Sequence, residues 1–278
     1  MLIDAHIHIG RENSAWAVRP CKEMLMEYLN RGIGGVRDGG DARRTGLAAR
    51  EAAREIGIVY KTPIVAITKR GGYGGFLGVE VDGIDEIRSF FPEFLEMKPD
   101  YTKAVCSGIL IDEAYGRMIP GGLSFKELEY LVKLSHDQGL KVMAHCIGAE
   151  GIEHALRAGV DSVEHGYLAS EEQLYRMREQ GIIWVPTIAT FANELYRNKA
   201  YPEEMKKVLQ RYVDDQIELI ARGYEMGVRM ALGSDAGPEF TDHGQALLDE
   251  IDYFVQAGIP RTEVIRMCEE NGQELLDW

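Results

Sequence analysis

Short apolar runs alternate along the chain with longer stretches in which apolar residues recur at helical spacing. This alternation is typical of βα units arranged around a parallel sheet. The runs of strand length are residues 2–9, 35–37, 58–67, 101–106, 140–145, 160–165, 182–186 and 228–232. The stretches of helical pattern are residues 22–30, 45–56, 84–96, 125–138, 149–158, 171–180, 203–226, 244–257 and 261–271.

Eight such units predict an α/β fold, a single (β/α)8 TIM barrel that spans residues 1–278 as one domain. An open doubly wound sheet is disfavoured because no G-x-G-x-x-G turn follows the first strand. Several predicted helices end at a glycine directly before the next strand, as at Gly159 and Gly227. Glycine adopts the left-handed conformation that ends a helix without a Cβ clash, so these positions fit helix-to-strand joints.

Charge and composition narrow the class of partner. The 31 Lys and Arg residues are outnumbered by 45 Asp and Glu residues, which argues against binding to a phosphate backbone. No apolar run reaches the roughly 18 residues of a membrane span, and the first residues lack the order of a signal peptide. We therefore expect a cytoplasmic protein that acts on a small molecule, with no nucleic-acid or membrane partner. Whether it forms a homo-oligomer is left open.

Histidines gather at the ends of the predicted strands, where α/β barrels carry their active sites. His6 and His8 end the first strand, and their i, i+2 spacing places both rings on one face. His145 and His165 end the fifth and sixth strands, and Asp235 follows the eighth. Four imidazoles and a carboxylate form a ligand set suited to zinc or a similar divalent ion. The remaining histidines, expected to be structural, are His136, His154 and His243.

Lys103 lies on the fourth predicted strand. Divalent cations would repel an ammonium group there, so this side chain must turn away, stay neutral or become an anion by reaction with CO2. Glu164 falls on the face opposite His165 and is expected outside the ligand set. Asp4 and Asp38 are candidates to orient the histidines, since a metal-bound imidazole usually donates its other N–H to a carboxylate or carbonyl.

Six segments in barrel order resemble the amidohydrolase superfamily, within it the imidazolonepropionase-like and prolidase-like branch. They are residues 2–8, 36–40, 100–103, 144–152, 158–166 and 231–237. The resemblance implies a hydrolase with two divalent metal ions, expected to be Zn2+. It assigns His6, His8 and Asp235 to one metal and His145 and His165 to the other, with carboxylated Lys103 as the bridge.

The same resemblance implies a reaction. A hydroxide that bridges the metals would attack an amide, lactam or related acyl C–N bond of a small molecule, with Asp235 as general acid and base. Ester, lactone or phosphotriester hydrolysis falls within the same chemistry. Relatives usually add a small β-sandwich built from both termini, whereas here the first strand begins at Leu2, so we expect the barrel alone.

Substrate contacts are expected from the loops that follow the predicted strands. Relatives often carry a further histidine where this chain has Ile147, and a Gly-rich segment, 71–75, replaces a histidine-containing loop. Arg70 and Arg117 could receive a substrate carboxylate, because guanidinium groups pair bidentately with carboxylates. The predicted substrate-binding residues are Arg70, Tyr73, Tyr115, Arg117 and Tyr167.

Two alternatives remain. A mononuclear deaminase of an aminated ring would leave Lys103 without a role, and residues 145–148 lack the His-Ala-Gly-Glu order of such enzymes. A barrel that binds metal without catalysis would need only a closed site of four ligands and no bridging lysine. The binuclear hydrolase is the leading hypothesis.

Overall fold

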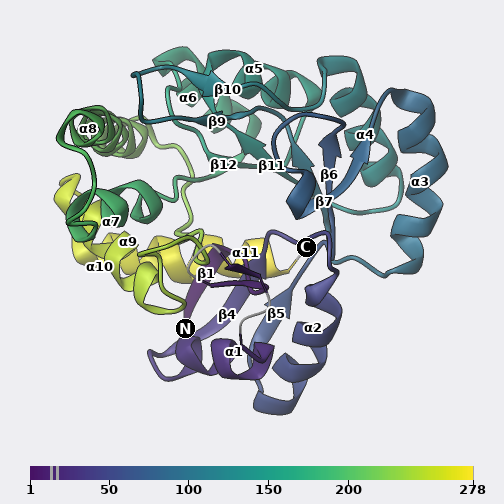
Figure 1. The fold of residues 1–278 in the computed structure, drawn as a ribbon, viewed down its shortest axis with the longest axis horizontal. Coiled ribbons are helices and arrows are strands. Elements are labelled where there is room, and N and C mark those ends of the chain that lie inside the picture. The colour runs from purple at the N-terminus through teal and green to yellow at the C-terminus, as the bar shows by residue number, and fades with distance from the viewer. Residues whose placement is uncertain (13–14, 17–18, 278) are drawn as a thin grey trace.

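The computed structural model describes residues 1–12, 15–16 and 19–277 (Figure 1). Its strands are β1 (Leu2–Ile7), β2 (Arg11–Glu12), β3 (Ala15–Trp16), β4 (Ile33–Asp38), β5 (Val59–Lys61), β6 (Ala66–Lys69), β7 (Gly78–Val81), β8 (Thr102–Val105), β9 (Ile109–Leu110), β10 (Met118–Ile119), β11 (Val142–Cys146), β12 (Ser162–His165) and β13 (Ile183–Val185). Its main helices are α1 (Cys21–Leu29), α2 (Thr45–Ile56), α3 (Ile84–Glu96), α4 (Phe125–Asp137), α5 (Gly148–Ala158), α6 (Glu171–Gln180), α7 (Ala189–Arg197), α8 (Glu203–Met226), α9 (Gln245–Gln256), α10 (Arg261–Arg266) and α11 (Gly272–Leu276).

Nine of the strands form two parallel sheets that together make the predicted barrel, whereas β2–β3 and β9–β10 are antiparallel hairpins. One sheet has the order β1-β4-β5, and the other has the order β13-β12-β11-β8-β6-β7. Residues 229–236 close the ring on one side, because Ala231 N donates to Trp184 O on β13 and Ala5 N on β1 donates to Leu232 O. On the other side Asp100 N, just before β8, donates to Thr62 O, just after β5. Figure 1 shows the helices surrounding this ring of strands.

The barrel interior is packed at the end opposite the strand carboxyl ends. Leu275 of α11 forms a buried cluster there with Ala5, Ile183, Val185 and Ala231. Because this apolar cluster fills that end, polar side chains that enter the barrel gather at the other end, where the carboxyl ends of the strands lie. The helix-to-strand joints are confirmed at Gly159 and Gly227, which both have a φ of 78°.

Two predicted strands differ in detail from the structure. The strand predicted over 58–67 is divided into β5 and β6, because Pro63 has no N–H for a ladder and Ile64 adopts a φ of 66°. The strand predicted over 228–232 is reduced to an isolated bridge between Met230 and Trp184. The hairpin β9–β10 and helix α7 were not predicted. Among the described residues, no helix is both long enough and apolar enough to cross a bilayer.

Candidate metal centre

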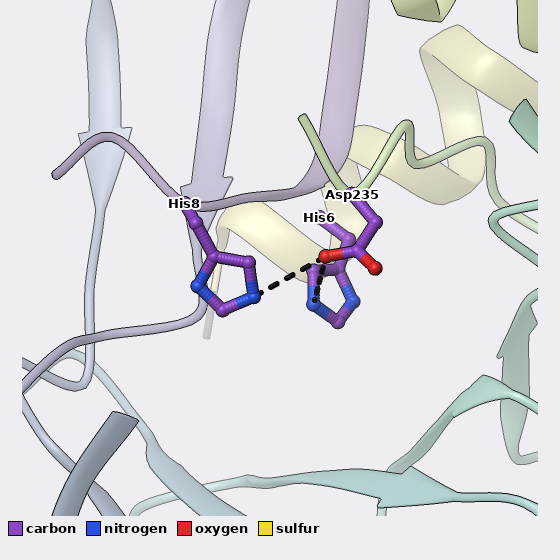
Figure 2. A group of neighbouring side chains, drawn as sticks. All are labelled: His6, His8 and Asp235. Atoms are coloured by element: carbon purple, nitrogen blue, oxygen red, sulfur yellow. Dashed lines mark ion pairs between the residues drawn. The ribbon is translucent and has the colours of Figure 1, made fainter. Parts of the chain in front are cut away.

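His6, His8 and Asp235 lie together at the mouth of the barrel (Figure 2). Each offers one ligand atom, and these atoms lie within 4.8 Å of one another. Asp235 Oδ1 is 3.2 Å from His8 Nε2 and 3.6 Å from His6 Nε2. The backbone explains this approach: Asp235 has a φ of 53° and its N–H donates to His6 O at 2.7 Å, so the turn places its carboxylate over the end of β1.

The ionisation states of this cluster suit a cation. Burial alone would raise the pKa of Asp235, but the hydrogen bond from His8 and the neighbouring histidines hold it well below its usual range. Burial and nearby Lys103 lower the pKa of His6 to about 4. At neutral pH the site therefore presents a carboxylate beside a neutral imidazole, and these are the forms that bind metals.

A buried ion pair holds the His6 ring. Its Nδ1 lies 2.7 Å from Glu164 Oε2, and the other carboxylate oxygen accepts from Arg37 Nη2 at 2.5 Å. Arg37 also donates to Ala5 O at 2.7 Å. The ionised Glu164 fixes the imidazole proton on Nδ1, which leaves the lone pair of Nε2 pointing into the site. Among the described residues that buried Nε2 has no hydrogen-bond partner.

Breaking this ion pair should cost stability. We expect Arg37→Met to lower the free energy of unfolding by about 3–5 kcal/mol, because it leaves the carboxylate of Glu164 buried without its cation. Arg229→Met is the matched control, since Arg229 pairs with Glu274 at the surface and its loss should cost at most ~1 kcal/mol. Urea unfolding of both variants measures the difference. Equal losses would contradict a special role for the buried pair.

His145 and His165 form a second pair of imidazoles beside the first cluster. Their ring centroids are 4.6 Å apart, and His165 lies 5.1 Å from His6. Each ring has one nitrogen held: His145 Nε2 lies 3.0 Å from Gly108 O, and His165 Nδ1 lies 2.7 Å from Thr187 Oγ1. Burial lowers the pKa of His145 to about 3 and that of His165 well below its usual value, so both rings are neutral.

Two features that strand periodicity does not predict orient the His165 ring. His165 has a φ of 68°, which turns its side chain toward the barrel mouth although it follows Glu164 directly. Thr187 is held by the start of α7, where Glu250 accepts hydrogen bonds from Ile188 N at 3.2 Å and Ala189 N at 2.7 Å. The buried carboxylate on α9 therefore fixes the threonine that orients the imidazole.

Lys103 lines the same cavity as both groups of histidines. Its side chain is 1% exposed, and its Nζ has no hydrogen-bond partner among the described residues. Burial lowers the pKa of Lys103 to about 8, although Glu164 opposes this shift. A buried amine with a lowered pKa has an accessible neutral form, and only the neutral form can react with CO2.

Asp4 and Asp38, proposed from the sequence to orient the histidines, instead accept hydrogen bonds from backbone N–H groups and from hydroxyl side chains. Asp4 accepts from Ser234 N at 2.8 Å and Ser234 Oγ at 2.6 Å, which fixes the turn before Asp235. Asp38 accepts from Ile9 N at 3.1 Å, directly after the first metal-ligand candidates. Glu164, predicted outside the ligand set, is the carboxylate that holds an imidazole.

Sequence reasoning missed Arg37, Thr187 and the carbonyl of Gly108. Only Arg37 carried a signal, because a charged residue within an apolar strand indicates a buried ionic partner. The three remaining histidines, predicted to be structural, lie outside the group of ligand candidates, and each contacts another part of the chain. His136 pairs with Asp161, His154 lies beside Phe125, and His243 bonds Tyr28 and Arg11 O.

A cavity of about 310 Å3 opens over the site. Tyr73 and Tyr167 line it, as predicted from the sequence. The cavity lining does not include the other three predicted substrate contacts: Arg70, Tyr115 and Arg117. Instead Arg11, on β2, places a guanidinium in the lining, a residue that the sequence analysis did not select.

The structure does not bring Arg70 and Arg117, predicted to receive a substrate carboxylate, into the lining of this cavity. Arg70 donates to Val81 O across the β6–β7 edge, and its exposed guanidinium pairs with Glu86. Arg117 lies exposed in the β9–β10 turn. Tyr115 donates a hydrogen bond to Asp215 on α8 and is not part of the cavity lining. All three follow barrel strands in sequence, but extra strands carry them outward.

The sequence model of the Amidohydrolase family matches residues 2–278. The chain belongs to the amidohydrolase family. Ochratoxinase from Aspergillus niger is 29% identical over 180 residues, which is 64% of this chain and 36% of the fungal protein. The match thus spans about a third of ochratoxinase. An uncharacterised protein from Mycobacterium tuberculosis is 26% identical over 276 residues, 95% of this chain and 70% of that protein.

Solved structures share the barrel. A Xaa-Pro dipeptidase with methionine bound in its active site superposes with a TM-score of 0.82 at 25% identity, covering 99% of this chain and 75% of that chain. Crystalline A. niger ochratoxinase gives a TM-score of 0.80 at 23% identity, over 99% of this chain and 71% of that chain. These similarities confirm the barrel assignment.

Proposed function

We propose that this protein is a binuclear metal-dependent hydrolase that cleaves an amide or related acyl C–N bond of a small molecule. The observation that carries the proposal is the pair of orphaned nitrogens, His6 Nε2 and Lys103 Nζ, buried at one cavity with four further ligand candidates. Buried polar atoms are nearly always satisfied, so atoms without a protein partner indicate a ligand. Family membership and the ochratoxinase and dipeptidase relatives support hydrolysis of an amide bond.

The donor set fits two divalent ions. His6, His8 and Asp235 would hold one ion, and His145 and His165 would hold the other. Carboxylated Lys103 would supply one oxygen to each, which also removes the ammonium charge from between two cations. Nitrogen and carboxylate donors in this number suit Zn2+, and each site keeps positions open for water or substrate.

When bound, such ions lower the pKa of coordinated water and polarise a substrate carbonyl. The chain itself supplies proton transfer and orientation. Asp235 is ionised at neutral pH, so it can accept a proton and then deliver it to the leaving amine. Glu164 and Thr187 hold the rings of His6 and His165 in single orientations, so the ligands need no rearrangement.

A mononuclear centre is the second candidate. It is favoured by one observation: within the described residues, only His6, His8 and Asp235 form a group compact enough to hold an ion as the side chains stand. A single metal would suit ring deamination, but it would leave the buried Lys103 amine without a partner. Metal counting distinguishes the two.

We expect purified protein loaded with excess zinc to retain close to two metals per chain. His145→Ala should reduce this number to about one, because the three ligands of the first ion remain, and should abolish turnover in a panel of N-acyl amino acids, dipeptides, cyclic amides and lactones. His136→Ala is the matched control, since His136 pairs with Asp161 at the surface. Elemental analysis after dialysis measures both. One metal or fewer in the unaltered protein would overturn the binuclear proposal.

A further inference from the structure

Two apolar walls, formed by different segments of the chain, line the cavity over the candidate metal centre. Tyr73, Phe76 and Leu77, from the segment between β6 and β7, form the first wall. The Tyr73 ring lies 5.6 Å from Phe76 and 5.2 Å from His145, so this wall adjoins a metal-ligand candidate directly. An aromatic surface therefore begins where the reacting carbonyl would lie.

The second wall comes from loops that follow other barrel strands. It contains Ile109, Ile147, Tyr167 and Phe191. The rings of Tyr167 and Phe191 are 4.9 Å apart, and Tyr167 is fixed further by its carbonyl, which accepts from Gly148 N at 2.9 Å. Ile147 and Tyr167 closely follow the buried strands β11 and β12, whereas Phe191 lies on α7 and Ile109 lies on β9.

Within the second wall, the hydroxyl of Tyr167 is left without a partner. Tyr167 is 4% exposed, and its hydroxyl has no hydrogen-bond partner among the described residues. A buried O–H that lines a cavity is a donor for whatever fills that cavity.

We infer that the substrate is an amide whose acyl group is a flat aromatic ring, held between the two walls, with an oxygen that accepts a hydrogen bond from Tyr167. The inference rests on the proposed function and names its substrate class. Aromatic side chains favour offset or edge contacts with another ring. An engineered cavity of about 150 Å3 holds benzene, so about 310 Å3 accommodates one ring and a small amine portion.

The test compares N-benzoylalanine, N-(cyclohexylcarbonyl)alanine and N-acetylalanine as substrates of the zinc-loaded protein. We expect kcat/KM for the benzoyl compound to exceed that for the acetyl compound by about 10–100-fold, as hydrophobic pockets commonly discriminate. The cyclohexyl compound has similar size without flatness and should fall between them. Equal rates for the benzoyl and acetyl compounds would overturn the inference while the proposed hydrolase remained established.

Tyr167→Phe removes only the hydroxyl and should raise KM for the benzoyl compound about 10-fold with little change in kcat. Tyr175→Phe is the matched control, because Tyr175 is 46% exposed on α6 and outside the cavity. Calorimetric titration of N-benzoylalanine into the metal-free protein gives a readout that does not depend on turnover. Binding that weakens in Tyr167→Phe supports the inference even if no amide is cleaved, which would count against the proposed reaction alone. Absence of binding overturns the inference.

Discussion

Asp235→Asn is expected to lower kcat by about 10²–10⁴-fold at saturating zinc. The amide keeps the shape of the carboxylate and an oxygen toward His8, but it cannot accept a proton. The turn at Asp235 depends on its backbone N–H, which donates to His6 O, and not on its carboxylate. The variant should therefore fold normally. Steady-state kinetics with the best substrate of the panel, at a metal content confirmed by elemental analysis, measures the effect.

Asp242→Asn serves as the control, because Asp242 lies exposed in the same loop region, beyond the cavity lining. The kcat of Asp242→Asn should lie within a factor of about two of the kcat of the unaltered protein. Retention of more than a tenth of kcat in Asp235→Asn with full metal would show that another group transfers the proton.

Lys103→Ala is expected to remove both the bridge and the activity. The loss of metal affinity should exceed the roughly 10–100-fold that follows removal of a residue that only orients a ligand. Formate, acetate or propionate should restore part of the activity, because the truncated side chain leaves space for a carboxylate between the two ligand groups. Lys141→Ala, which alters an exposed lysine paired with Asp161, should change neither property.

Carboxylation of Lys103 can be detected directly by nuclear magnetic resonance. Zinc-loaded protein supplied with 13C-labelled bicarbonate should show a carbamate carbon resonance that is absent from Lys103→Ala. If the unaltered, active enzyme showed no such resonance, the lysine would act as a neutral amine and the bridging role would be wrong.

Much of the ligand set could be predicted from the sequence, because it depends on local periodicity. His6 and His8 share a face through the two-residue repeat of a strand, and the structure brings both to Asp235. The end of a barrel strand is a defined place in space, so the positions of His145 and His165 at strand ends were enough to predict that they meet at one cavity. The order of strands did not need to be known.

Residues in connecting loops could not be placed in the same way. Arg70 follows β6 at least as closely as Tyr167 follows β12, but its backbone N–H pairs with Val81 O of β7, and Arg117 lies exposed in the turn of the β9–β10 hairpin. These extra strands are only two to four residues long. Periodicity over so few residues predicts nothing, and their pairing depends on partners distant in the chain.

The sequence by itself determined the barrel, the histidines that gather at the candidate metal centre and the face on which His6 and His8 lie. Only the tertiary structure decided how those residues are held: Arg37 reaches Glu164 across 127 positions, and Glu250 fixes Thr187 beside His165 from α9. Left-handed backbone at His165 and Asp235 aims both side chains inward against the strand alternation. Such contacts and turns are selected by the whole packed barrel, whereas strand periodicity is a property of neighbouring residues alone.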